Sequence, residues 1–359
     1  MKRLSRIFCV VLAIAVLSAA AVFPSYAGSK SVTSKGNYNY TNAQKVFKIM
    51  NKERKKRKLK PLKLDKNLTK SAMLRAAEIQ YNYSHTRPNG TKCTTAFKWT
   101  GSCGENITRL EKTAAKAMKS WMKSKGHKKN ILRSDFTRVG VGCFVNSYGD
   151  LFWVQCFSGG SAKVCKTKGV KCVTVKVALQ RGGKTTVKYE KKVPKIKSVK
   201  LSKASVVFNG KNQKYSLKVK DTKGRTVPKK YYRVSSYPDK FKEIGTYEIT
   251  VMSVYRAEKF TLRFKILPPT PKLFEVNSFD TGATVSWEKL PGGVMGYEVE
   301  CSDNPDFKGA KWTYTQDTSC TFDWLDGKTD YYFRVRGEYF TYSGSLMSDW
   351  SNVVKHTQP

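Results

Sequence analysis

The sequence predicts a multidomain protein in which helices pack on both sides of a small antiparallel sheet and two all-β sandwiches follow. The hydrophobic period changes from helical to alternating near residue 139, and only alternating segments follow. The net charge then changes sign at the proline-rich segment 268–271. The 359 residues are enough for two to four domains. Because 40% of the residues are hydrophobic, the net charge of +42 does not indicate a disordered polycation.

The N-terminus has the pattern of a secretory signal. Three basic residues lie within the first six positions, residues 7–23 are almost all apolar, and Ser25-Tyr26-Ala27 forms a small-x-small cleavage site. The alternative is a membrane anchor, because the apolar run is nearly long enough to span a bilayer. No later run approaches the ~20 apolar residues of a membrane helix. We therefore predict a signal peptide over residues 1–27 and a secreted protein that does not span the membrane.

The cysteine count suggests disulfides. Cys9 is removed with the signal, and eight cysteines remain in an oxidising compartment. A Cys301–Cys320 bridge is expected because these two cysteines stand alone near the C-terminus. A Cys93–Cys103 bridge is expected because a short loop joins them. The sequence leaves four cysteines without an assigned partner: Cys143, Cys156, Cys165 and Cys172.

The first module, residues 28–160, begins with helical patterns. Thr41, with Gln44 three residues later, predicts a capping box, and Asp65 and Thr113 are candidate caps of two further helices. Residues 139–145 and 151–157 then alternate as the strands of a hairpin that turns at Tyr148-Gly149.

The second module contains only strand patterns. Residues 196–267 alternate apolar side chains with an exposed set rich in lysine, and Phe208-Asn209-Gly210-Lys211 is a hairpin signal. Residues 161–195, which contain Cys165 and Cys172, are expected to be a connector or the first strands of this sandwich. The module is immunoglobulin-like in its pattern.

The third module, residues 268–359, resembles a fibronectin type III domain. The matching strings include the strand that ends at Trp287, the segment Thr329–Arg336, and Ser348-Asp349-Trp350-Ser351. The resemblance implies that Trp287 fills the space between two sheets and that Tyr331 makes a corner hydrogen bond.

Residues ~40–158 resemble the CAP superfamily of cysteine-rich secretory, antigen 5 and pathogenesis-related proteins, and most of all its bacterial secreted branch. Five strings carry the resemblance: Ser84–Gly90, Gly104–Ile107, Trp121–Leu132, Phe136–Gly142 and Trp153–Gln155. It implies a three-layer α-β-α sandwich. It also implies a cleft that two histidines and two glutamates line in the eukaryotic members, where it can hold a divalent metal.

His85, Glu105 and His127 match three of these four cleft positions, and Ser124 stands where the second glutamate is usual. Asn106, next to Glu105, is a further candidate for the cleft. Two imidazoles and one carboxylate are a possible Zn²⁺ site with an open coordination position. The alternative is structural: His85 bonds Glu105, and His127 ends a helix, where the helix dipole stabilises its charge.

These features favour an extracellular binding protein at the bacterial cell envelope, with the His/Glu cleft as the ligand or metal site. Residues 28–160 carry a net charge of +21 and residues 161–267 carry +23, whereas residues 268–359 carry −5. The two basic segments suggest adsorption to teichoic acid or peptidoglycan. The alternative is that these charges form only a solvated surface. Nucleic-acid motifs are absent. The alternative function is a secreted hydrolase, with or without zinc, that acts on peptide or cell-wall material. Ser124, His127 and Glu105 are suitable residue types, but no nucleophile elbow is present and no catalytic residue is assigned.

Overall fold

A computed structural model describes residues 30–237 and 240–357. The predicted signal peptide, residues 1–27, lies outside the described residues. The described residues divide into two compact units: the first consists of residues 30–34, 38–144 and 151–189, and the second of the remaining residues from 190 on together with the short segments 35–37 and 145–150. Among the described residues, no helix has the length and apolar character needed to cross a membrane.

The first unit contains a seven-stranded sheet with the order β3-β5-β4-β1-β6-β7, and β2 pairs in parallel with β4. Its strands are β1 (Ser31–Asn39), β2 (Lys63–Leu64), β3 (Cys103–Arg109), β4 (Arg138–Asn146), β5 (Leu151–Ser158), β6 (Val170–Ala178) and β7 (Thr186–Tyr189). Strand β3 therefore lies at one edge. Residues 170–189, which the sequence placed in a connector or in the middle sandwich, supply β6 and β7 to this sheet.

Local capping signals set where the helices of this unit begin. The helices are α1 (Tyr40–Lys55), α2 (Lys66–Glu78), α3 (Ala114–Lys123) and α4 (Lys125–Leu132), with the 3-10 turn η1 (Cys93–Ala96). Asp65 caps α2 and Thr113 caps α3, as predicted. The prediction of a Thr41 cap is wrong: Asn39 accepts the hydrogen bond from the Asn42 amide, so α1 begins at Tyr40.

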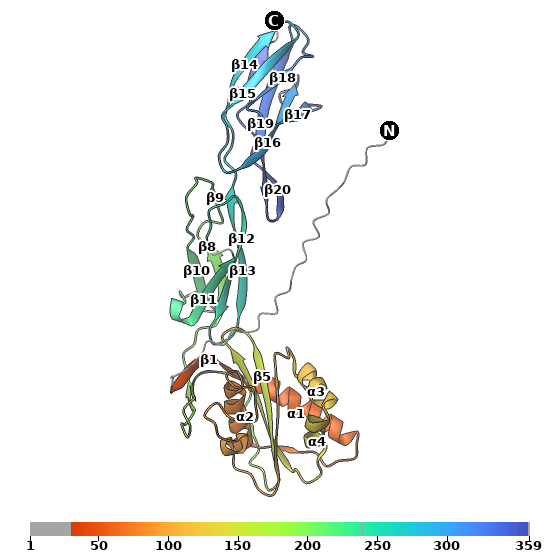
Figure 1. The fold of residues 1–359 in the computed structure, drawn as a ribbon, viewed down its shortest axis with the longest axis vertical. Helices are drawn as coiled ribbons and strands as arrows, with labels where there is room; N and C mark the ends of the chain where they lie inside the picture. The colour runs from red at the N-terminus through yellow and green to blue at the C-terminus, as the bar shows by residue number, and fades with distance from the viewer. Residues whose placement is uncertain (1–29, 238–239, 358–359) are drawn as a thin grey trace. The chain divides into compact units, whose positions relative to one another are not determined.

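Helices contact both faces of the sheet. A Cβ at Gly142 in β4 would lie 2.1 Å from the Ala72 carbonyl oxygen, so the α2 backbone rests directly on this strand. On the other face, the Gln155 amide of β5 reaches the sulfur atoms of Met50 in α1 and Met118 in α3. Figure 1 shows α2 on one side of β5 and α3 and α4 on the other.

The middle module consists of strands. They are β8 (Ile196–Leu201), β9 (Ser205–Val207), β10 (Leu217–Asp221), β11 (Tyr232–Tyr237), β12 (Gly245–Ser253) and β13 (Lys259–Leu267), with the 3-10 turn η2 (Lys229–Tyr231). Strand β8 pairs with β10, and the other sheet has the order β11-β12-β13-β9. Asn209-Gly210 does turn, but it forms no hairpin because β9 pairs in parallel with β13.

The C-terminal module contains two further sheets, with orders β14-β15-β18 and β17-β16-β19-β20, and β21 pairs with β19. Its strands are β14 (Leu273–Phe279), β15 (Gly282–Trp287), β16 (Val294–Ser302), β17 (Lys311–Thr315), β18 (Ser319–Phe322), β19 (Asp330–Thr341), β20 (Gly344–Met347) and β21 (Val354–Thr357). Trp287 is buried against the edge of the Tyr297 ring. The Tyr331 hydroxyl accepts a 3.0 Å hydrogen bond from the Asp326 amide, a corner contact of the expected kind.

Candidate functional site

The site is built around Glu105 on the edge strand β3. The Glu105 side chain is only 1% exposed, and Arg75 of α2, which is 0% exposed, neutralises its charge. Arg75 Nε donates to Glu105 Oε2 at 2.8 Å, and Arg75 Nη2 donates to Oε1 at 3.2 Å. A buried carboxylate with two such bonds is charged and held in one orientation.

His85 lies in the loop after α2 and is the solvent-facing member of the site. Its Nδ1 lies 2.9 Å from Glu105 Oε1, while 57% of its side chain is exposed. A bond between these two residues was one of the two alternatives expected from the sequence. Because the carboxylate is fixed from inside the domain, the imidazole is oriented before any ligand arrives.

A second buried glutamate extends the network behind the site. Glu78, also 1% exposed, accepts from Arg75 Nη1 at 3.0 Å and from Arg87 Nη2 at 2.7 Å. The Thr185 hydroxyl donates to the same carboxylate at 2.7 Å. Two carboxylates and two guanidinium groups thus balance in charge. Arg75 and Glu78 were not predicted from the sequence, although their three-residue spacing on an apolar helix face is a signal for an ion pair.

The charges of the site act on its titratable groups in different directions. Hydrogen bonds to Cys93 and Glu105 raise the pKa of His85 from 6.5 to about 9. Burial would raise the pKa of Glu105, but its hydrogen bonds from His85 and Arg75 outweigh that and hold the pKa below the ordinary value. Burial and then the nearby charge of His85 lower the pKa of His127. His85 is therefore cationic at neutral pH, and His127 is neutral.

Asn106 anchors α4 to the edge strand. Its amide nitrogen donates to the His127 carbonyl oxygen at 3.0 Å and to Gln155 Oε1 at 2.9 Å. Its Oδ1 accepts from Asn130 Nδ2 at 2.9 Å. Asn106 is 0% exposed, so it positions His127 from within the domain and presents no surface to a ligand.

His127 and Ser124 differ from the sequence expectation. His127 does not end a helix: it lies in the first turn of α4, where the helix dipole disfavours a positive charge. Ser124 lies between α3 and α4, and its side chain makes no capping bond. Glu105, which a Ser124/His127/Glu105 triad would need beside His127, bonds His85 and Arg75 instead.

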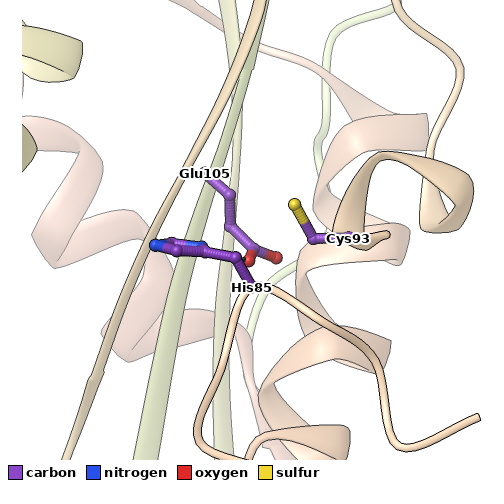
Figure 2. Close-up of side chains that lie close together, drawn as sticks. All are labelled: His85, Cys93 and Glu105. Atoms are coloured by element: carbon purple, nitrogen blue, oxygen red, sulfur yellow. Dashed lines mark hydrogen bonds and ion pairs between the residues drawn. The ribbon is translucent and has the colours of Figure 1, made fainter. Parts of the chain in front are cut away.

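The expected disulfides are absent. All eight cysteines of the described residues are thiols. Cys301 lies in β16 and Cys320 in β18, in different sheets of the C-terminal module. Cys93 lies in η1 beside His85 and Glu105 rather than against Cys103, and Figure 2 shows this group.

The donors that converge are not the three that the CAP resemblance implies. Among the described residues, the cluster whose ligand atoms all lie within 4.8 Å of one another is His85, Cys93 and Glu105, without His127. The implied set of His85, Glu105 and His127 therefore fits a shared ion only in part. The sequence signal for Cys93 was its place after the turn Pro88-Asn89-Gly90, which follows His85 closely.

Comparison with known proteins identifies two of the modules. Residues 47–157 match the cysteine-rich secretory protein family, CAP, and residues 268–357 match the fibronectin type III domain. The chain thus contains a CAP domain and a C-terminal fibronectin type III domain, as the sequence resemblance indicated.

Several relatives of the CAP domain are bacterial. The chain is 40% identical over 122 residues to the uncharacterized protein YkwD of Bacillus subtilis (strain 168), a match that covers 32% of this chain and 46% of YkwD. The chain therefore spans less than half of that curated relative. An extracellular protein with an SCP domain from Bacillus anthracis is 27% identical, with a TM-score of 0.30, over 33% of this chain and 40% of that one.

A cysteine-rich secretory protein from Staphylococcus aureus is 20% identical, with a TM-score of 0.27, over 33% of this chain and 39% of that one. The names of the Bacillus anthracis and Staphylococcus aureus proteins describe an extracellular and a secretory protein.

Proposed function

We propose that this protein is a secreted binding protein of the bacterial cell envelope, in which the surface at His85 is the ligand site and the basic modules adsorb to anionic polymers. The observation that carries the proposal is the exposed, charged imidazole of His85 on the buried, fixed carboxylate of Glu105. A fixed cationic donor at the surface favours a ligand with an anionic or carbonyl oxygen. Because the imidazole is already oriented, binding costs no further side-chain entropy at His85.

The middle module supports the adsorption part of the proposal. Its strands alternate buried apolar residues with exposed lysines, among them Lys197, Lys200 and Lys265. This module is strongly basic, because residues 196–267 contain 18 lysines and arginines but only five acidic residues, a net charge of +13. Many separate lysine contacts to a polyanion release counterions, and this supplies affinity that falls as salt rises.

The test uses the whole mature chain and isolated cell wall, with and without teichoic acid. A variant with Lys197→Glu, Lys200→Glu and Lys265→Glu should bind anionic wall more weakly, and its affinity should depend on salt with a slope smaller by up to about three. The matched control makes the same charge change in the acidic C-terminal module, at the exposed Lys289, Lys308 and Lys328. We expect it to bind almost as the parent does.

Two results would contradict the adsorption proposal. Wall binding that stays constant in high salt would indicate a largely uncharged ligand. An equal loss in the two triple variants would show that only the net charge of the chain matters, and not the middle module.

A further inference from the structure

We propose that His85, Cys93 and Glu105 form a binding site for a thiophilic divalent metal, with Zn²⁺ as the expected ion, in which the Cys93 thiolate is a ligand. This site shares two residues with the cleft that the CAP resemblance implies, but its third ligand is Cys93 and not His127. It stands on its own geometry and does not depend on the proposed role at the cell envelope.

The donor atoms are close enough for one ion. They lie within 4.8 Å of one another. Zinc bonds of about 2.0–2.3 Å in a tetrahedron place ligand atoms about 3.3–3.8 Å apart. Closing the remaining gap takes roughly an ångström, which the exposed His85 and half-buried Cys93 side chains can supply while Glu105 stays fixed.

The backbone holds two of the ligands together. The Cys93 amide donates to the His85 carbonyl oxygen at 2.8 Å. Thr86 and Lys92, the next residues toward the tip of the loop, form an antiparallel β-bridge. Gly90, at φ +76°, supplies the turn that lets the loop fold back. The loop therefore presents His85 and Cys93 to Glu105 as one preformed unit, which lowers the ordering cost of binding.

The arrangement favours a metal over a nucleophilic thiol. In a Cys-His-acid triad the two imidazole nitrogens face the thiol and the carboxylate separately. Here Nδ1 already faces Glu105, and Figure 2 shows Cys93 and Glu105 on the same side of the imidazole, away from its other nitrogen. Three different donors that converge on one point are a chelate.

Charge and protons balance when the metal binds. Zn²⁺ replaces the thiol proton of Cys93 and the Nδ1 proton of His85, both protons go to solvent, and Nε2 keeps its hydrogen. No electron is transferred. Arg75 does not repel the ion strongly, because it is itself paired with Glu78 as well as Glu105.

Cobalt is the probe for the test, since a thiolate ligand gives Co²⁺ a sulfur-to-metal charge-transfer band. Reduced, metal-free, full-length mature protein should show this band on addition of Co²⁺, and Zn²⁺ should displace it. Cys93→Ser should abolish the band and weaken Zn²⁺ binding by about tenfold or more, because even a lost outer-shell partner costs that much. The matched control, Cys103→Ser, removes another half-buried thiol near the site and should keep the band.

A measurement on the unmodified protein accompanies the variants: saturating Zn²⁺ should slow alkylation of Cys93 and leave Cys103 unprotected. His127→Ala should keep both the band and the protection. Three outcomes would overturn the proposal: no band in the parent, a band that persists in Cys93→Ser, or a Cys93–Cys103 disulfide in protein collected from the culture medium. Zinc binding that is lost in His127→Ala but kept in Cys93→Ser would assign the ion to the two histidines instead.

Discussion

Glu105 and His85 form an ion pair whose two ends differ in environment: the carboxylate is 1% exposed, the imidazole is 57% exposed, and 2.9 Å separates Oε1 from Nδ1. The position of a surface group is therefore decided in the domain interior, where Arg75 fixes the carboxylate. A change at Arg75, which is buried in α2, should therefore alter the position of the exposed imidazole.

The first prediction concerns Arg75. Arg75→Met should destabilise the CAP domain by about 3–5 kcal/mol, because it leaves two buried carboxylates, Glu105 and Glu78, without their shared partner. The measurement is denaturant unfolding, followed on the transition that belongs to the CAP domain, since a multidomain chain need not unfold in one step.

The control for this prediction is an exposed pair in the same domain. Arg57 bonds Glu53 at 2.8 Å, and its side chain is 38% exposed. Arg57→Met should cost at most about 1 kcal/mol. Equal losses in the two variants would show that the Arg75 network adds nothing beyond an ordinary surface contact.

The second prediction concerns pH. Hydrogen bonds to Cys93 and Glu105 raise the pKa of His85 to about 9 in the folded protein, above the 6.5 of the free side chain. The stabilisation from charged His85 should be fully present below pH 6.5 and lost as the pH rises through 9. Its size is reduced by solvent screening, because the imidazole is more than half exposed.

Two measurements check the pH prediction in metal-free protein with chelator present. An NMR titration of the His85 ring should have its midpoint near 9, and Glu105→Gln should move the midpoint down. The stability difference between the parent and His85→Gln should be largest near pH 6 and vanish above pH 9. A midpoint near 6.5 in the parent would argue that the His85–Glu105 bond does not persist in solution.

Local signals explain what the sequence predicted well. Asp65 and Thr113 each cap a helix with a side chain three residues from its bonding partner, so a short string of residues contains the whole interaction. The same logic failed at Thr41 because Asn39, two residues earlier, is an equally good cap. The sequence around residues 39–41 therefore does not decide which of these two side chains caps the helix.

The candidate site was only half predictable for a related reason. The CAP resemblance directed attention to His85, Glu105 and His127, and the bond between His85 and Glu105 was the structural alternative to a metal cleft at these positions. Arg75 and Cys93 were missed because their roles depend on α2 and η1 both lying against the edge strand β3. The spacing of residues along the sequence does not indicate this packing. Residues 170–189 joined the first sheet for a similar reason, since alternating strands do not specify which sheet they pair with.

The third prediction concerns Asn106. Asn106→Asp keeps the shape of the side chain but removes both of its hydrogen-bond donors, so the His127 carbonyl and the Gln155 amide oxygen lose their partner. We expect a loss of about 1–3 kcal/mol and faster hydrogen exchange of the α4 amides. Asn82→Asp, at a surface position that bonds the Thr86 carbonyl, is the control and should change little. Unchanged exchange in α4 would show that other contacts hold this helix.

The last prediction concerns the contact between α2 and the sheet. A Cβ at Gly142 would lie 2.1 Å from the Ala72 carbonyl oxygen and 2.7 Å from the Met73 amide nitrogen, so Gly142→Ala must push the α2 backbone away from β4. The expected cost is at least about 1–3 kcal/mol, because the clash is with backbone and not with a mobile side chain end.

The displacement should also reach the functional site, because Arg75 lies in the same helix one turn after Ala72. The His85 titration midpoint should fall in Gly142→Ala as the Arg75–Glu105 contact loosens. Gly126→Ala is the matched control: Gly126 lies in α4, a Cβ there meets no atom within 4 Å, and alanine is the better helix former by about 1 kcal/mol. Gly126→Ala should leave the titration midpoint of His85 unchanged and the stability equal or higher.

A Gly142→Ala protein that is as stable as the parent and has the same His85 midpoint would contradict this prediction. It would mean that α2 and β4 do not approach as closely in solution, so that Arg75 of α2 could not be said to fix Glu105.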